Sequence, residues 1–482
     1  MKMNGRSKRD TPGLGRDEIA WLTATELVSA FKTRSLSPLE VTKAILARIE
    51  RLDPLLKAFV LVDSEGALAA ASKAEARWAG GRPLGLLDGV PVSIKDIVLT
   101  RGLPTRRGSR LIDPDQAWDE DGPAVARLRE AGAVILGKTT TPEFAAKPVT
   151  ISPLTGTTRN PWNLAYSPGG SSGGAGAAVA AGLGPLALGT DAGGSIRIPA
   201  SLCGVFGFKP SGGRVPMYPP TPYGTLASFG PMTRSVVDAA LMLSVIARPD
   251  PRDWSALPYQ KIDYPALLQR ANLQQWRIAW SPTLGYARVD PEVADLAEAA
   301  VERLAEWGAR IEKVESVFED PATFLETFKR GLTDYAFRHL DERSLEQMDP
   351  DLAEEIRQSR GASLRAHLDA EMARAALGRR MCAFHQDYDL LLTPTLAGPP
   401  FPVELQSPEG YGRYEWLAFS YPFNLTRQPA ASLPCGFTDA GLPVGLQIVG
   451  PMYADLLVLQ AAHAFERILP WADRRPNLEP SE

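Results

Sequence analysis

Two short clusters of glycine and serine are the part of this sequence best suited to chemistry. Residues 166–176 read Tyr-Ser-Pro-Gly-Gly-Ser-Ser-Gly-Gly-Ala-Gly, and residues 188–199 read Leu-Gly-Thr-Asp-Ala-Gly-Gly-Ser-Ile-Arg-Ile-Pro. Glycine lets backbone N–H groups turn toward a ligand, because it tolerates positive φ and close approach. Serine becomes a nucleophile only when a neighbouring group accepts its proton. The clusters therefore offer hydroxyls and an anion cradle, and they require a base from elsewhere in the chain.

Lys95 is the best candidate for that base. It lies in Asp-Gly-Val-Pro-Val-Ser-Ile-Lys-Asp-Ile-Val-Leu-Thr at residues 88–100, a run rich in β-branched residues that predicts a mostly buried strand. Lysine is rarely buried without a reason. Burial lowers its pKa by disfavouring the ammonium form, which makes it a base. The residues alone leave a second interpretation open, in which Lys95 pairs with Asp96 or extends to water.

Three other patterns point to different chemistry, and none is convincing. The four histidines lie among helix-forming residues, so nothing predicts a Ser-His-Asp triad; they are His339, His367, His385 and His463. Residues 132–139 fit the GxxxxGK(S/T) pattern of a phosphate-binding loop, but the apolar residues 133–136 within it predict a buried strand. Residues 169–173 fit the GxSxG nucleophile elbow, but no convincing strand precedes them and no HGGG-like segment occurs.

The segments around Lys95 and the two clusters resemble those of the amidase signature hydrolases, a family that uses a Ser-cisSer-Lys triad. The resemblance is carried by residues 92–96, 169–174 and 189–199. Further matching segments are residues 136–144, 158–163, 204–211, 229–236 and 441–451. The similarity covers most of residues 22–470, in the right order, which makes it highly specific.

The resemblance implies a role for each member of the triad. Ser195 would be the nucleophile that forms an acyl-enzyme, Ser171 would be the bridging serine, and Lys95 would be the base. A cis peptide bond would join Gly170 to Ser171. The sequence by itself does not choose between Ser171 and Ser172.

The resemblance also implies an oxyanion hole in the second cluster. Its donors would be the backbone N–H groups of Ala192, Gly193, Gly194 and Ser195, and one such donor is typically worth about 10²–10³ in rate. Asp191 and Arg197 flank this cradle at a spacing that could pair them. We interpret these two residues as structural supports of the loop.

Aromatic residues concentrate in two segments that could form a substrate entrance. Residues 401–423 contain seven of them, and residues 217–223 read Met-Tyr-Pro-Pro-Thr-Pro-Tyr. Substrate pockets are mostly apolar with aromatic walls, so we expect an apolar or aryl amide substrate. The alternative is that these side chains belong to the core. The candidate substrate-binding residues are Gly170, Thr190, Tyr218 and Trp416.

The expected activity is hydrolysis of carboxylic amide C–N bonds, with esters and carbamates as further substrates. The main alternative is the glutaminase subunit of a tRNA-dependent amidotransferase, although residues 191–195 and 423–432 look more like those of free amidases. A catalytically idle binding protein on the same fold is a third option. The joint presence of Lys95, Ser171 and Ser195 weighs against it.

Composition agrees with a cytoplasmic enzyme that acts on a small-molecule amide. The formal net charge of −4 over 482 residues gives no basic footprint for nucleic acid. Three scattered cysteines suggest neither a disulfide framework nor a zinc site. The N-terminus lacks the apolar region of a signal peptide, and no 18-residue apolar run predicts a membrane span. We expect no cofactor, no metal and no nucleic-acid or membrane partner, and the chain could form a homodimer.

The order of elements predicts an α/β fold, with one large domain over residues 21–482 after a disordered extension at residues 1–20. Ser37-Pro-Leu-Glu40 is a capping box that opens a helix extending to about Leu52. The expected strands are residues 58–62, 90–99, 133–136, 186–188, 277–280, 310–314, 390–394, 431–434 and 444–449. Helical patterns between them imply a mixed, twisted central sheet covered on both faces. The proline-rich residues 247–265 are interpreted as a surface crossover, with a domain linker as the alternative.

Overall fold

Eleven strands form one sheet in the computed structural model, which describes residues 15–221 and 223–478. Their order across the sheet is β1-β3-β2-β6-β8-β7-β12-β13-β11-β9-β10. The strands are β1 (Phe59–Val62), β2 (Pro91–Lys95), β3 (Val134–Thr139), β6 (Leu186–Asp191), β7 (Phe206–Lys209), β8 (Ser228–Thr233), β9 (Arg277–Trp280), β10 (Arg310–Lys313), β11 (Leu390–Pro394), β12 (Ala430–Phe437) and β13 (Pro443–Val449). A separate two-stranded sheet consists of β4 (Ile151–Ser152) and β5 (Gly156–Thr157).

The central sheet is mixed, as the sequence predicts. Strand β2 runs parallel to β3 and β6, and β9 runs parallel to β10 and β11. The remaining pairings are antiparallel. All nine predicted strands are present: β9 and β11 have the predicted ends, and the other seven have shifted ends. Strands β7 and β8 of this sheet were not predicted.

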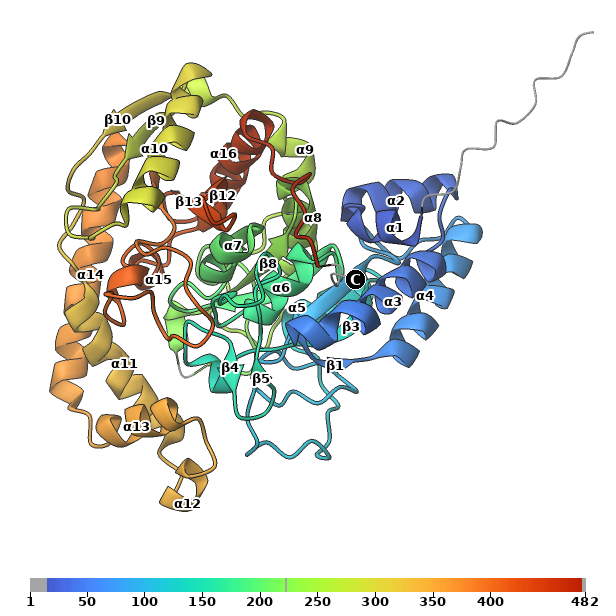
Figure 1. The fold of residues 1–482 in the computed structure, drawn as a ribbon, viewed down its shortest axis with the longest axis horizontal. Coiled ribbons are helices and arrows are strands. Elements are labelled where there is room, and N and C mark those ends of the chain that lie inside the picture. Colours follow the sequence, from blue (N-terminus) through green and yellow to red (C-terminus); the bar gives the residue numbers. More distant parts are fainter. Residues whose placement is uncertain (1–14, 222, 479–482) are drawn as a thin grey trace, which may run out of the picture.

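Helices flank this sheet on both faces (Figure 1). They are α1 (Arg16–Trp21), α2 (Ala24–Thr33), α3 (Pro38–Leu56), α4 (Ser64–Ala79), α5 (Pro123–Glu130), α6 (Gly173–Ala180), α7 (Arg197–Cys203), α8 (Val236–Ile246), α9 (Tyr264–Leu268), α10 (Pro291–Glu306), α11 (Ala322–Phe337), α12 (Glu342–Leu345), α13 (Pro350–Ser359), α14 (Leu364–Asp387), α15 (Pro422–Leu425) and α16 (Asp455–Ile468).

Successive side chains of β6 pack in different hydrophobic clusters on the two faces of the sheet. Ala187 packs in one cluster with Ala175 of α6, while its neighbours Leu186 and Leu188 belong to the cluster that includes α8. Successive strand residues point to opposite faces of a sheet. The side chains on both faces of β6 are therefore buried against other elements.

The predicted capping box does open a helix. Ser37 Oγ accepts a hydrogen bond from the N–H of Glu40 at 3.1 Å, and the Glu40 carboxylate accepts one from the N–H of Ser37. Helix α3 continues past the expected end at Leu52 to Leu56, because Leu52 and Leu56 are both buried against the core. Lys57, the residue after the helix, adopts a left-handed conformation.

Helix α1 contradicts part of the predicted disordered extension. Residues 1–14 lie outside the described residues, but residues 16–20 are helical, so the prediction is wrong there. Ile19 and Ala20 are buried in the core. Asp17 forms ion pairs with Arg48 at 3.0 Å and Arg51 at 2.7 Å, which fasten α1 to α3.

The proline-rich residues 247–265 form a crossover along the surface. They connect α8 to α9, which pack against one another and against α16. Trp254 is almost fully exposed, while Leu257 N–H donates to Gly213 O at 2.8 Å and keeps the segment against the body. The segment does not separate two domains.

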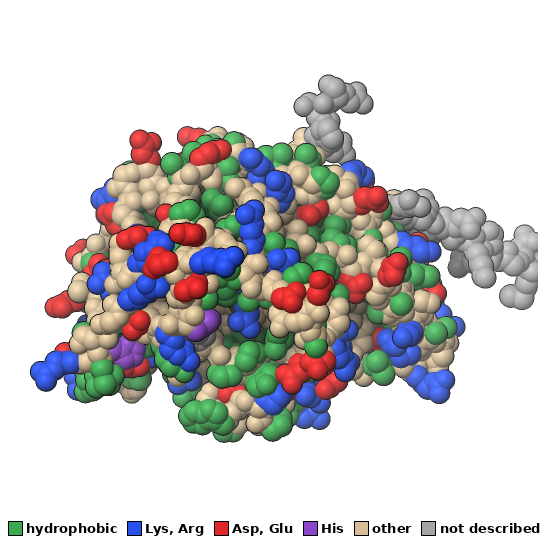
Figure 2. Space-filling view, turned by 90° about the horizontal axis from the view of Figure 1, so that it is seen from below, with side chains coloured by type: hydrophobic (Ala, Val, Ile, Leu, Met, Phe, Trp, Pro, Cys, Tyr) green, Lys and Arg blue, Asp and Glu red, His purple; other side chains and the backbone are tan. Residues whose placement is uncertain are grey.

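Helices α11–α14 form a group at one side of the molecule, drawn in tan and orange in Figure 1. This group packs on itself through α11, α13 and α14, and α14 also contacts α15. Seen from below, the surface carries charges of both signs interspersed with apolar side chains (Figure 2). In the described part of the chain, no helix is both long and apolar enough to cross a membrane.

Candidate active site

Lys95 is the last residue of β2 and is fully buried. Its Nζ lies 2.7 Å from Ser171 Oγ, 2.9 Å from Ser172 Oγ and 2.9 Å from Thr190 Oγ1. Asp96, the partner in the alternative interpretation, faces away, because its carboxylate lies 3.9 Å from Lys138 Nζ. Lys95 is therefore surrounded by hydroxyls and not by a paired carboxylate.

This environment favours the neutral amine. Burial lowers the pKa of Lys95 well below its usual range, and the negative charge of Asp191 opposes the shift only in part. A neutral amine has a lone pair that can accept a proton from a hydroxyl at hydrogen-bond distance. Lys95 can thus act as a general base toward Ser171.

The loop before α6 brings two serines to Lys95. The peptide bond between Gly170 and Ser171 is cis, as the resemblance implies. Ser171 lines a cavity and places its Oγ 2.7 Å from Lys95 Nζ. Ser172 is fully buried, and its Oγ also donates to Thr190 O at 3.1 Å. The structure thus distinguishes the two serines, because only Ser171 faces the cavity.

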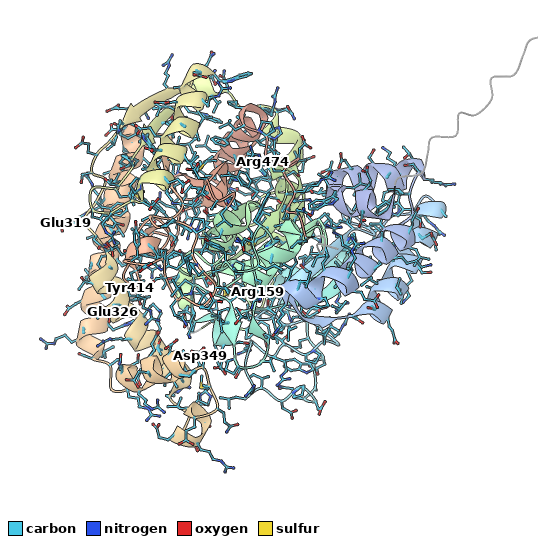
Figure 3. All side chains as sticks on the ribbon, viewed as in Figure 1. Arg159, Glu319, Glu326, Asp349, Tyr414 and Arg474 are labelled. Atoms are coloured by element: carbon cyan, nitrogen blue, oxygen red, sulfur yellow. The ribbon has the colours of Figure 1, made fainter. Side chains whose placement is uncertain are left out.

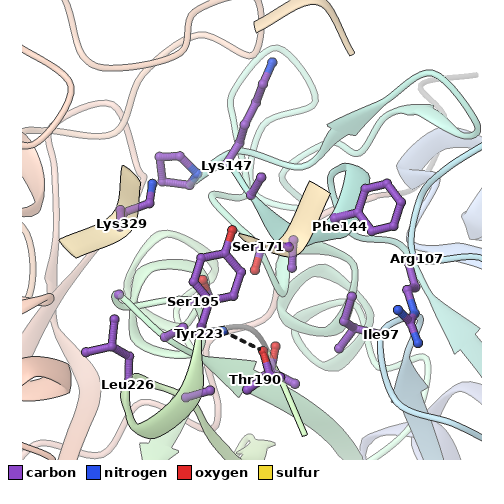
Figure 4. A pocket seen from close by; sticks show the side chains of 18 of the residues that line it. Ile97, Arg107, Phe144, Lys147, Ser171, Thr190, Ser195, Tyr223, Leu226 and Lys329 are labelled. Carbon is purple, nitrogen blue, oxygen red and sulfur yellow. Dashed lines mark hydrogen bonds between the residues drawn. The ribbon is translucent and has the colours of Figure 1, made fainter. Parts of the chain in front are cut away.

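Ser195 lies in the loop between β6 and α7, on the wall of the same cavity. Its backbone carbonyl accepts a hydrogen bond from the N–H of Ser172 at 3.1 Å. This bond joins the two glycine–serine clusters in space, although they are separate in the sequence. In Figure 4 the side chains of Ser171 and Ser195 lie together at the centre of the cavity.

Asp191 and Arg197 support this loop, as predicted. The Arg197 guanidinium lies 3.0 Å from the Asp191 carboxylate, and both side chains are fully buried. Burial acts to raise the pKa of Asp191, but the ion pair and hydrogen bonds with Arg197 outweigh it and hold that pKa well below its usual range. Arg197 further donates to Asn424 Oδ1 at 2.6 Å and to Gln447 Oε1 at 2.7 Å.

The predicted oxyanion donors are not equivalent. The N–H groups of Ala192, Gly193 and Ser195 donate to no acceptor within the described residues, and all three residues line the cavity. Gly194 differs from the prediction, because its N–H already donates to Asp191 Oδ1 at 2.8 Å. Its φ of 123° and the 2.6 Å from a built Cβ to Ser420 Oγ show why glycine is needed there.

A cavity of about 600 Å³ adjoins these groups. Its walls are predominantly apolar and include Ile97, Phe144, Ile198, Leu226 and Leu325. Two of the four candidate substrate-binding residues, Thr190 and Tyr218, line it. Its size is that of pockets which hold drug-sized organic molecules.

The other two candidates, Gly170 and Trp416, do not line the cavity. Trp416 is fully buried and packs edge to face against Phe401, so it belongs to the core. A Cβ at Gly170 would lie 2.7 Å from Val149 N, so this glycine allows a close backbone approach instead of contacting a ligand. Assigning Trp416 and Gly170 to the substrate site was wrong for these reasons.

The two aromatic segments likewise contain residues that line the cavity and residues that do not. Tyr414 and Tyr421 line the cavity, whereas Phe419 and Phe423 are fully buried beside Trp416. From the second segment, residues 217–221 and Tyr223 line the cavity. Part of each aromatic segment thus lines the cavity, and Phe419 and Phe423 belong to the core.

Several cavity residues were missed by sequence reasoning. They include Arg107, Phe144, Lys147, Leu325, Lys329 and Arg413. They come from loops and from α11, and their sequence neighbours have no motif in common. Composition gives no signal that segments this far apart meet at one cavity.

The phosphate-binding pattern and two of the four histidines have ordinary structural explanations. Residues 134–139 form β3, and the buried Lys138 donates to Val98 O and Thr105 Oγ1 at 2.7 Å, so there is no phosphate-binding loop here. His385 and His463 hydrogen-bond to Gln428 and Gln269. Within residues 15–221 and 223–478, no three His, Cys, Asp or Glu side chains are grouped as metal ligands would be.

Comparison with known proteins identifies the family. The amidase profile matches residues 40–459. The chain belongs to the amidase signature family. This amidase is therefore an amide-hydrolysing enzyme, which removes the alternative of an idle binding protein.

Individual relatives of the amidase match over nearly its whole length. It is 38% identical to an acylamidase of Rhodococcus erythropolis, over 95% of this chain and 97% of that protein. It is 35% identical to a glutamyl-tRNA(Gln) amidotransferase subunit of Chloroflexus aggregans, over 96% and 99%. Among solved structures, a bacterial aryl acylamidase of the amidase signature family has a TM-score of 0.87 and 32% identity, covering 94% of this chain and 97% of that one.

Proposed function

We propose that this amidase cleaves carboxylic amides with apolar or aryl groups through an acyl-enzyme on Ser195. The observation that carries the proposal is the environment of Lys95, which is fully buried and contacts hydroxyls at 2.7–2.9 Å. A buried lysine without a paired carboxylate is costly to the fold. Such a group is characteristic of a functional site.

In the proposed first step, neutral Lys95 accepts the proton of Ser171 while Ser171 accepts that of Ser195. Ser195 Oγ then attacks the substrate carbonyl carbon, and the carbonyl oxygen becomes an oxyanion. The N–H groups of Ala192 and Gly193, which have no acceptor among the described residues, supply donors for that oxyanion. Donors fixed in advance stabilise the developing charge without the cost of reorientation.

The second half of the cycle reverses the proton path. Lys95, now protonated, returns its proton through Ser171 to the amide nitrogen, and the C–N bond breaks to release the amine. Water then attacks the acyl-enzyme while the same relay accepts its proton. The relay returns that proton to Ser195 Oγ as the ester bond breaks, and the carboxylic acid leaves. Relayed acid–base steps of this kind contribute about 10²–10⁴ in rate.

The substrate class follows from the cavity walls and the relatives. Aromatic residues Tyr218, Tyr223, Tyr414 and Tyr421 and the apolar side chains around them suit an apolar or aryl group. The similarity to an acylamidase and an aryl acylamidase supports the same class. Esters and carbamates with the same groups present the same carbonyl to Ser195, and we propose them as additional substrates.

A substrate panel tests this proposal. Acetanilide-type, aliphatic and small polar amides are compared by kcat/KM, alongside the corresponding phenyl esters and carbamates. Anilides and long-chain aliphatic amides should be turned over fastest. Fastest turnover of small polar diamides would contradict the proposal.

The similarity to a glutamyl-tRNA(Gln) amidotransferase supports a second candidate, a glutaminase that releases ammonia within a complex. The apolar cavity walls fit poorly with the polar side chain of glutamine. Measuring ammonia release from glutamine by the purified chain separates the two. Glutaminase activity that exceeds anilide hydrolysis, or that requires a second protein, would favour this candidate.

A further inference from the structure

Positive charge is unevenly distributed over the cavity walls. Among the described residues that line the cavity, four are Lys or Arg and none is acidic; the four are Arg107, Lys147, Lys329 and Arg413. A cation beside apolar walls is costly unless an anion pairs with it. The four cations differ in whether a carboxylate of the protein offsets their charge.

Lys147 is already neutralised. Its Nζ lies 2.5 Å from Asp349 Oδ1 and 2.5 Å from Asp351 Oδ2, at the start of α13. Asp349 lies where the α11–α14 group meets the rest of the molecule (Figure 3). Lys147 thus connects that group to the loop after β3, and the two carboxylates already neutralise its positive charge.

Lys329 and Arg413 share one carboxylate. Lys329 Nζ lies 3.4 Å from Glu355 Oε1, and Arg413 Nη2 bonds to the other oxygen of Glu355. Both cations also lie against the ring of Tyr414, at 5.8 Å and 5.7 Å from its centroid. Their ion pairs hold one wall of the cavity together.

Arg107 is different, because its guanidinium has no hydrogen bond or ion pair within residues 15–221 and 223–478. Burial lowers the pKa of Arg107, and Asp96 opposes this shift from a distance. Asp96 is itself occupied, since it accepts from Gly108 N–H at 3.2 Å and faces Lys138 at 3.9 Å. In the described part of the chain, Arg107 thus retains a positive charge that no carboxylate pairs with directly.

The backbone holds Arg107 in an unusual conformation that directs it to the cavity. Its φ is 54°, in the left-handed region that residues other than glycine rarely adopt. The carbonyl of Arg107 accepts from Phe144 N–H at 2.8 Å, which fixes this turn beside the cavity wall. Strained backbone of this kind is concentrated at functional sites. In Figure 4, Arg107 and Lys329 lie on opposite sides of Ser171 and Ser195.

We propose that the preferred amide substrate carries a carboxylate, and that Arg107 binds this group at the end of the cavity opposite Lys329. The inference rests on amide hydrolysis at Ser195 and specifies the substrate class further. The planar guanidinium fork matches a carboxylate with two parallel hydrogen bonds. One unpaired guanidinium offsets the single negative charge of a carboxylate.

The first test compares substrates matched in shape. On the amine half, 4-acetamidobenzoate is compared with 4-methylacetanilide and 4-(aminomethyl)acetanilide. On the acyl half, succinanilate is compared with pentananilide. We expect one of the two carboxylates to exceed its neutral partner in kcat/KM by about 10- to 100-fold, the range of a charge-assisted hydrogen-bonded pair. The half that shows the preference identifies which side of the amide faces Arg107.

The second test changes the charge at residue 107. The ratio of kcat/KM for the preferred carboxylate to that for its neutral partner should fall to about one in R107M, and R107E should favour the cationic anilide. Arg110 is exposed on the same loop and does not line the cavity, so R110M should keep the wild-type ratio. Thermal denaturation checks that each variant is folded.

The ratio of the two kcat/KM values distinguishes a role of Arg107 in carboxylate binding from a role in the fold. Damage to the fold would lower kcat/KM for the carboxylate and for its neutral partner equally. An unchanged ratio in R107M, or wild-type enzyme that disfavours both carboxylates, would overturn the proposal and leave amide hydrolysis standing. Full activity of S195A on neutral anilides would instead overturn the proposed mechanism itself.

Discussion

Replacing Lys95 with methionine should stop hydrolysis while leaving the fold intact. Methionine is unbranched and close to lysine in length, so it can fill the buried space without a large cavity. The change removes three hydrogen bonds to hydroxyls, worth up to about 4 kcal/mol together. It also removes a buried amine whose desolvation opposes folding, so the net change in free energy of unfolding should be about 2 kcal/mol or less.

The effect on rate should be much larger. Ser171 has no other hydrogen-bond partner among the described side chains, so without Lys95 no base accepts its proton. Loss of a general base costs about 10²–10⁴ in kcat. We expect kcat to fall by about 10³ or more, with KM for an anilide changed by less than about threefold, since Lys95 does not line the cavity.

Lys138 offers a matched control. It is also a fully buried strand lysine, on the neighbouring strand β3, and its Nζ donates to a carbonyl and two threonine hydroxyls. Its partners do not include a serine of the site. K138M should lose stability and keep kcat per folded molecule, measured by anilide hydrolysis with the folded fraction determined by circular dichroism.

The comparison can refute the reasoning in two ways. If K95M retains more than about a tenth of the wild-type kcat, Lys95 is not the base. If K95M and K138M lose activity in proportion to their loss of folded protein, the role of Lys95 is structural.

Four further predictions concern the buried residues Lys95, Asp191, Lys209 and Trp416. The kcat/KM of the wild-type enzyme should fall as the pH drops through the lowered pKa of Lys95, because the ammonium form cannot accept a proton; a profile without this acidic limb would argue against the base. D191N should lose about 3–5 kcal/mol of stability in urea denaturation, because Arg197 would keep a buried unpaired charge, and a loss below about 1 kcal/mol would contradict this. Burial lowers the pKa of Lys209 to about 7, below its value in the unfolded chain, so the unfolded state binds a proton more tightly than the native state does. Replacing this lysine in K209M should therefore raise the free energy of unfolding by on the order of 3 kcal/mol near pH 6. The gain should disappear as the pH rises past 10.5, where the lysine is neutral in both states. W416F should lower the melting temperature without changing KM, and a raised KM would restore Trp416 to the substrate site.

Local signals in the sequence predicted most of the scaffold. The capping box at Ser37 and the β-branched runs are decided by near neighbours, so they survive in the folded chain. The burial of Lys95 followed from its β-branched neighbours for the same reason. Strands β7 and β8 were missed because glycine and proline interrupt them at Gly207, Gly230 and Pro231, and only pairing with neighbouring strands makes them regular.

The cavity was less predictable, because it depends on which direction each side chain takes. Tyr414 and Trp416 are two residues apart, yet Tyr414 faces the cavity and Trp416 packs in the core. The turn at residues 415–417 decides between them, and composition does not. Likewise Gly194 differs from Gly193 through one hydrogen bond to Asp191, which no spacing rule predicts.

The central claim is that Ser195 carries the acyl group, and mass spectrometry of the trapped intermediate tests it most directly. The enzyme is mixed with an excess of an aryl ester, quenched in acid within the first turnovers, digested and mapped. We predict an acyl mass increase on the peptide containing Ser195, absent from a folded S195A variant that also loses several orders of magnitude in activity. Acyl groups on Ser171 instead, or near-normal hydrolysis by S195A, would contradict the account.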